Sequence, residues 1–178
     1  MKSFILGILI FVSWTAAVHS QQHIHGQGSV FIAQENDLWQ VQFVLPASDI
    51  LGFEHSPENE QQRLIAEQFD QKQKHFENLI QFDVNCTQVN YSQSSLEFGE
   101  DEHSDSHELS DNHEHSGEHE HSDIEILYLI ECPDEVTQVS FPILNSSNNL
   151  QNLAVQWSIQ TGQGSTLINP KRHQLKWH

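Results

Sequence analysis

One stretch of the sequence limits what the rest of the chain can fold into. Residues 103–121 read HSDSHELSDNHEHSGEHEH and hold six histidines among serines and carboxylates, with Leu109 as the only large apolar side chain. Such a stretch buries too little apolar surface to offset the entropy of ordering its backbone. We therefore expect residues 99–123 to form a flexible surface loop, and the core to come from the sequence on either side of it.

The N-terminus predicts a secreted protein. Lys2 precedes a short apolar run over residues 4–12, and small residues then lead to Ser20. The run is shorter than the roughly 18 residues that a membrane-spanning helix needs, which favours a cleaved signal peptide over residues 1–20. The alternative, an uncleaved anchor, is disfavoured because polar residues follow at once. We expect residues 21–178 to form one β-rich metal-binding domain with no integral membrane segment.

The charge of the chain restricts its partners. The full sequence has 25 acidic and 7 basic residues, and loss of Lys2 would leave six basic residues and a formal net charge of −19. Nucleic acids and anionic membranes would be repelled by such a surface. Metal cations or a basic protein surface are the partners that this charge favours.

The sulfur-containing residues also point to the compartment. Cys86 and Cys132 are the only cysteines, and an isolated pair in an oxidising compartment usually forms a disulfide. Thiolate ligation of a metal or two free thiols are the alternatives. Met1, the only methionine, would be lost with the signal peptide, so the mature chain lacks the soft ligands of a Cu(I) carrier.

Apolar periodicity predicts a sheet with one helix before the histidine-rich stretch. Residues 25–33 and 37–46 alternate as two strands joined by a polar turn, and Pro46 ends the second strand. A helix is expected to open at Ser56, which can cap it, with Pro57 in the first helical position. The apolar residues that predict its buried stripe are Ile65, Phe69, Phe76, Leu79 and Ile80.

The strands around the histidine-rich stretch predict a hairpin. Residues 82–91 alternate, and residues 124–132 are apolar on both sides, which is typical of a central strand. Antiparallel pairing of these two strands would bring Cys86 close to Cys132, leave residues 99–123 as the hairpin tip, and place a disulfide at the base of that loop. Further strands are expected at residues 136–143, 153–159, 165–168 and 173–177. The predicted fold class is α+β, mainly β: an antiparallel sheet or sandwich with one packed helix and a long disordered hairpin loop rich in His, Asp and Glu.

The loop chemistry is that of metal capture. Neutral imidazole and carboxylate are good ligands for borderline divalent cations, above all Zn²⁺. Histidines two residues apart lie on one side of an extended segment, and histidines four residues apart lie on one side of a helical turn. Several sets of ligands are therefore available. Alternatives are a solvated acidic linker and a pH sensor. The expected loop ligands are His103, His107, His113, His115, His119 and His121.

A second set of residues predicts a site on the folded domain. His23 and His25 precede the first strand, and Glu54 and His55 precede the predicted helix. Two ligands from one strand and one or two from a loop can make a tetrahedral zinc site, to which His173 is a further possible contributor. The alternative is a polar tail with two incidental histidines.

The expected N-terminus offers a different metal chemistry. Cleavage after Ser20 would leave a free amine on Gln21 with histidine in the third position, an arrangement that suits square-planar Cu²⁺ or Ni²⁺. Cyclisation of Gln21 would block that amine.

Several of these features together resemble one family. They are the signal peptide, His23-x-His25-Gly26, LGFEHSP at 51–57, the cysteine pair around a histidine-rich insert, and VQWSIQTGQG at 155–164. In combination they look like ZrgA, a family of bacterial periplasmic zinc-binding proteins. The resemblance implies zinc binding in the periplasm and support of an ABC-type zinc importer, with its solute-binding protein or permease as partner. It also implies that His23, His25 and His55 are folded-site ligands.

Other functions remain open at this stage. A secreted metalloenzyme of hydrolase or dismutase type, a nickel or copper buffer, and a pH sensor would also suit a β-rich secreted fold with His-x-His. The sequence has no HExxH motif and no nucleophile elbow, so we expect a protein that is not an enzyme.

Overall fold

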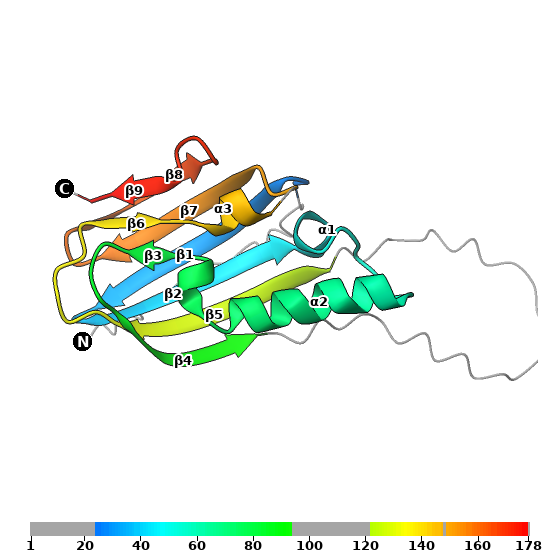
Figure 1. Cartoon of the computed structure of the whole chain (residues 1–178). Coiled ribbons are helices and arrows are strands. Elements are labelled where there is room, and N and C mark those ends of the chain that lie inside the picture. The colour runs from blue at the N-terminus through cyan, green and yellow to red at the C-terminus, as the bar shows by residue number, and fades with distance from the viewer. Residues whose placement is uncertain (1–23, 94–121, 148, 178) are drawn as a thin grey trace, which may run out of the picture.

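A computed structural model describes residues 24–93, 122–147 and 149–177. The predicted signal peptide, His23 and the six loop histidines lie outside these residues. The chain is mainly β, with one long helix, as the sequence predicted (Figure 1). Within the described ranges, no helix combines the length and the apolar character that crossing a membrane requires.

Six strands form the main sheet, in the order β4-β5-β2-β1-β7-β8. Strands β1 and β7 run parallel to each other, and every other neighbouring pair is antiparallel. The first two predicted strands form a hairpin, whose turn contains Asn36 with a positive φ of 55°. The strands are β1 (Gln27–Glu35), β2 (Leu38–Pro46), β4 (Thr87–Gln93), β5 (Asp123–Glu131), β7 (Asn152–Ile159) and β8 (Gly162–Ile168).

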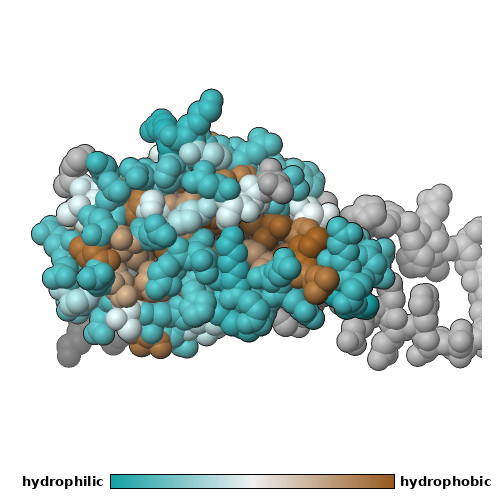
Figure 2. Space-filling view, viewed as in Figure 1, coloured by the Kyte–Doolittle hydropathy of each residue, from teal (hydrophilic) through white to brown (hydrophobic). Residues whose placement is uncertain are grey.

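A second layer covers one face of this sheet (Figure 1). It consists of the long helix and a small antiparallel sheet in the order β3-β6-β9. Figure 2 shows this face as mainly hydrophilic, with a hydrophobic area where α1 meets α2. Its elements are α1 (Ala47–Ile50), α2 (Glu60–Gln73), η1 (Phe76–Asn78), β3 (Gln81–Phe82), β6 (Gln138–Ser140), α3 (Ile143–Ser146) and β9 (Gln174–Lys176).

The core lies between the two layers. Alternate side chains of β1, β2 and β5 are buried there, and burial of each large apolar side chain stabilises the fold by about 1.5–3 kcal/mol. The Tyr128 hydroxyl, buried in this core, donates a hydrogen bond to the carbonyl oxygen of Gln73 at the end of α2. Burial raises the pKa of Tyr128 above its ordinary value, so the hydroxyl keeps its proton and holds α2 on the sheet.

The predicted start of the helix is wrong. Helix α2 begins at Glu60, not at Ser56, because Asn59 occupies the cap position and its Oδ1 accepts a hydrogen bond from the Gln62 amide at 3.0 Å. The helix ends at Gln73, so the last three residues of the predicted stripe follow it. They are nevertheless buried, through η1 and the turn after it: Phe76, Leu79 and Ile80.

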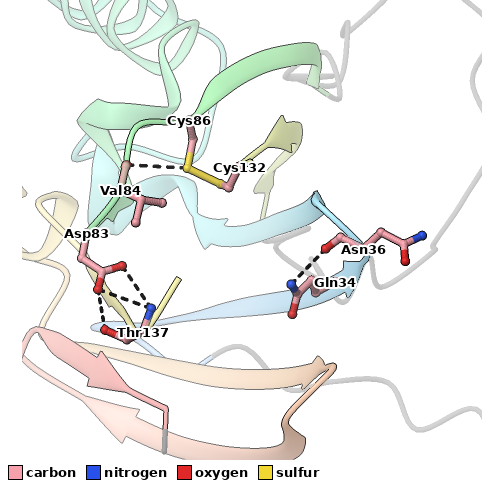
Figure 3. The surroundings of a disulfide bond; sticks show 7 residues. All are labelled: Gln34, Asn36, Asp83, Val84, Cys86, Cys132 and Thr137. Carbon is pink, nitrogen blue, oxygen red and sulfur yellow. Dashed lines mark hydrogen bonds between the residues drawn. A yellow bond between two sulfur atoms is a disulfide. The ribbon is translucent and has the colours of Figure 1, made fainter. Parts of the chain in front are cut away.

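The predicted strand over residues 82–91 is two strands in different sheets. Residues 83–86 cross from β3 in the small sheet to β4 in the main sheet. Asp83 holds this crossing, because its carboxylate accepts hydrogen bonds from the Thr137 amide at 3.2 Å and hydroxyl at 2.5 Å (Figure 3). Desolvation raises the pKa of Asp83, whereas hydrogen bonds from the Thr137 hydroxyl and from backbone amides lower it. The hydrogen bonds have the larger combined effect, so the pKa of Asp83 lies below its ordinary value.

The predicted disulfide between Cys86 and Cys132 is confirmed, with Cα atoms 4.4 Å apart. Its predicted position at the base of the histidine-rich loop is wrong. Figure 3 shows the bond between Cys86 and Cys132. It lies beside the β1–β2 turn, because the Cys132 amide donates to the carbonyl oxygen of Asp37 at 2.8 Å. The histidine-rich stretch joins β4 and β5 at the other end of their ladder, about 20 Å away. Strand β5 pairs on both sides, as its apolar sequence predicted.

Candidate metal-binding region

His25 occupies an exposed turn just before β1. The turn is closed by a hydrogen bond of 3.0 Å from the Gln27 amide to the carbonyl oxygen of Ile24. Gly26 has a φ of +79°, which the third position of a type II turn requires and which glycine adopts without steric cost. Glycine after the His-x-His motif is therefore what allows the chain to turn here.

The backbone next to His25 is held by bonds from both sides. The Gly26 amide donates to Asp49 Oδ2 at 2.6 Å, and the Gly26 carbonyl oxygen accepts from the amides of Gln151 and Asn152 at 2.8 and 2.9 Å. These contacts tie the turn to α1 and to the start of β7. His25 is thus presented from an anchored segment.

Asp49 is a residue that the sequence reasoning missed. It lies in α1, is only 6% exposed, and its main-chain oxygen accepts a bond of 2.7 Å from the Ser147 hydroxyl. A buried carboxylate is costly unless its oxygens are hydrogen-bonded or near positive charge, and here the known partner of Oδ2 is a neutral amide. The only feature of the sequence that could have drawn attention to Asp49 is its place as a single aspartate within the apolar segment LPASDILGF.

Glu54 and His55 follow α1, as the sequence predicted for a loop before the long helix. The exposed His55 ring lies against Phe53, with ring centroids 5.6 Å apart. Its Nδ1 donates to the carbonyl oxygen of Ser56 at 2.8 Å. Because a carbonyl can only accept, Nδ1 is the donor here, and in the neutral ring this leaves the lone pair that binds a metal on Nε2.

The histidine-rich stretch also reaches α1 at its C-terminal end. The Ala47 amide donates to the carbonyl oxygen of Ser122 at 2.9 Å, and Asp123 pairs with Pro46. Three groups therefore converge on α1: the turn that carries His25, the loop that carries His55, and the end of the acidic stretch. We call this end of the main sheet the α1 region.

The described residues do not assemble a complete metal site. Among them, no three His, Cys, Asp or Glu residues lie close enough together to hold an ion. His173 lies in the turn between β8 and β9, where its Nδ1 donates to the carbonyl oxygen of Pro170 at 3.1 Å and Lys171 and Arg172 are its neighbours in sequence. Adjacent cations oppose the binding of another cation. The ligand set of the folded site stays a prediction.

Comparison with protein-family models identifies the family of the chain. A family model described as "ZrgA family zinc uptake protein" matches residues 22–177. The match spans every described element, including the turn at His25, the α1 region and both cysteines. No curated protein matches the chain.

Proposed function

Because this chain belongs to the ZrgA family of zinc uptake proteins, we propose that it is a periplasmic accessory protein that captures or buffers Zn²⁺ and supports an ABC-type zinc importer. Zinc is its cargo. The proposal assigns it no catalytic activity, and it names the solute-binding protein or permease of the importer as its partner.

The composition of residues 94–121 supports the capture of zinc. The segment holds six histidines and ten acidic residues and no lysine or arginine. Imidazole and carboxylate at several spacings offer overlapping ligand sets for Zn²⁺, whereas Mg²⁺ and Ca²⁺ prefer shells made entirely of oxygen. We expect more than one ion per chain on this segment.

The convergence on α1 is the observation that carries the proposal. The proposed capture segment and the proposed folded site both contact this helix. Ser122, at the end of the segment, bonds to Ala47, and the turn of His25 bonds to Asp49. A histidine on an anchored turn has already lost its backbone freedom, so less ordering opposes binding than on an acidic loop. An ion could pass from the capture segment to this site over a short distance.

We propose that the folded site uses His23, His25 and His55. The tautomer of His55 supports this choice, since its Nε2 is available to a metal. Asp49, next to the turn, supplies a negative charge that favours a cation there. Glu54 and water are the options for a fourth ligand. His173 is the weakest member of the predicted set because of its basic neighbours.

Periplasmic location is part of the proposal. A cleaved signal over residues 1–20 would deliver the chain there, and the Cys86–Cys132 disulfide is compatible with an oxidising, extracytoplasmic compartment. A net charge of −18 attracts zinc ions to the protein and favours a partner with a basic docking surface.

A chelator competition on five proteins, the intact chain among them, tests the function. Excision of residues 100–121, which keeps Ser122 and its bond to Ala47, should lower the number of zinc ions bound and leave one tight site. In that background His25→Ala or His55→Ala should weaken the remaining site at least tenfold, and the control His75→Ala, at an exposed position between α2 and η1, should not. Parallel titration with Cu²⁺ and Ni²⁺, with hydrolase and superoxide assays, separates the alternatives. An excised protein that binds as many ions as before would refute the capture role.

A further inference from the structure

The few basic residues of this chain are unevenly placed. After residue 20 there are six, and three of them fall between positions 171 and 176. These three line a groove of about 500 Å³ between β8 and β9. We call it the basic groove, and the residues that define it are Thr166, Ile168, Lys171, Arg172, His173 and Lys176.

Among the described residues, the groove cations lack ion pairs of the kind that Arg63 and Lys74 make. Arg63 pairs with Glu60 at 2.8 Å, and Lys74 pairs with Asp70 at 3.0 Å. Within the described ranges, no carboxylate forms a salt bridge with Lys171, Arg172 or Lys176, whereas the chain as a whole carries 25 acidic residues. Three uncompensated positive charges on a strongly acidic protein form a site for an anionic group.

The strands that flank the groove can bind an extended chain. Strand β8 is the last strand of the main sheet and β9 is the last strand of the small sheet, and the two lie on either side of the turn at Asn169 (Figure 1). Each therefore presents backbone amides and carbonyls without a neighbouring strand. Unpaired strand edges bind extended peptides through the backbone, while side chains select the sequence. The basic side chains here select acidic residues.

The chain itself carries the matching partner within reach. Residues 94–121 contain ten carboxylates and no basic side chain. From Ser122 a path of contacts runs through Ala47 and Asp49 in α1, then Ser147 after α3, and ends with the bond of 3.0 Å from the Phe141 amide to the His173 carbonyl oxygen. This path is shorter than about 30 Å, since its helices are one turn each. Half of residues 94–121 spans about 45 Å when extended, so the segment can reach.

We propose that the basic groove is a docking surface for the chain's own acidic segment, residues 94–121, in the metal-free protein. Tethering gives the segment a high effective concentration at the groove, so weak ion pairs suffice to hold it. Zinc bound by the segment cancels part of its negative charge and weakens docking, a step that rests on the proposed function. A loaded protein thus exposes the groove and the edges of β8 and β9, and an empty one covers them.

Hydrogen exchange of the peptides that cover residues 162–177 tests the proposal, measured in EDTA at low salt. Exchange should be slower in the intact protein than after excision of residues 100–121, by about tenfold, the combined size of three exposed ion pairs. Lys171→Ala/Arg172→Ala/Lys176→Ala should remove this difference. The matched control, which removes three charges from α2 and its C-cap, should keep it: Arg63→Ala/Lys72→Ala/Lys74→Ala. High salt or zinc should abolish the slow exchange.

Several results would overturn the docking proposal. Equal exchange in the intact and excised proteins, or equal behaviour of the groove variant and the control, would show that the segment does not dock there. Protection that grows with protein concentration would assign the groove to a second copy of the chain. Protection that persists with zinc bound would refute the coupling to metal. Zinc stoichiometry on the same samples separates these failures from a failure of the proposed function. A synthetic peptide of residues 100–121, added to the excised protein, should bind about tenfold more weakly to the groove variant.

Discussion

Removal of the disulfide should destabilise the domain strongly and leave its metal chemistry intact. Cys86 and Cys132 are 46 positions apart. The loss of chain entropy in the unfolded state on closing a loop of this length corresponds to about 4 kcal/mol at 25 °C. We therefore expect Cys86→Ala/Cys132→Ala to lower the free energy of unfolding by about 3–4 kcal/mol. Strand β4 is an exposed edge strand with little core of its own, so few contacts replace the bond.

Urea unfolding followed by tryptophan fluorescence measures this loss, since Trp39 is buried against Phe82 and Trp177. The control is Val89→Ala, at a site of β4 that is 55% exposed, which should change stability by no more than about 0.5 kcal/mol. Zinc stoichiometry should be unchanged, because the disulfide and the α1 region lie at opposite ends of the sheet. A stability loss below about 1 kcal/mol, or a loss of zinc together with the disulfide, would refute this reasoning.

Three further changes test the local interactions. Asp49→Ala should release the turn of His25 by leaving the Gly26 amide without its acceptor, and should weaken the tight zinc site at least tenfold in a chelator competition; unchanged affinity would contradict the role of α1. Gly28→Ala should lower stability by about 1–3 kcal/mol in thermal unfolding, since the new Cβ would lie 2.7 Å from Leu45 Cδ2. Asp83→Asn should destabilise the domain at neutral pH, and the difference should shrink only as the pH falls below about 4 and through the lowered pKa of Asp83, because a lowered pKa contributes stability that is lost as the carboxylate is protonated; a loss independent of pH would contradict it.

The strands of the main sheet could be predicted because alternation reports which side chains face a core. It predicted β1 and β2 as strands and the central place of β5, whose one face is buried while Leu127 and Leu129 on the other face are half-buried. Alternation does not say which sheet a strand joins. Phe82, Val84 and Cys86 all pack inward, yet the chain changes sheets between the first and the last of them. The disulfide was predicted correctly as a pair, but the antiparallel pairing of β4 with β5 puts both cysteines at the end of the ladder away from the histidine-rich stretch.

The start of α2 was missed because two capping residues compete over a short distance. Two dipeptides have the composition of a helix start: Ser56-Pro57 and Asn59-Glu60. Only Asn59 caps the helix, because its side-chain oxygen accepts the hydrogen bond from the Gln62 amide. Local sequence could not choose between them, because the choice depends on where the helix must cross the sheet.

The sequence proposed a set of metal ligands for the candidate site but did not show how the backbone beside them is held. The turn of His25 bonds to Asp49 of α1, and Glu54 and His55 follow α1 in the chain. The buried carboxylate of Asp49 was not foreseen, since a single aspartate in an apolar segment looks like an ordinary residue of a first helical turn. The sequence shows that basic residues gather near the C-terminus and acidic residues in the histidine-rich stretch. Only the topology shows that the basic residues line a groove between the edge strands β8 and β9.

The metal content of the native protein shows whether it carries zinc in the cell. The chain would be recovered from the periplasm of zinc-replete cells without metal-affinity chromatography, and its metals would be counted by elemental mass spectrometry. Our account predicts zinc as the bound metal, at more than one ion per chain, and about one ion per chain in a strain that carries the excision of residues 100–121. Recovery of the protein with copper or nickel in place of zinc, or with no metal in either form, would contradict it.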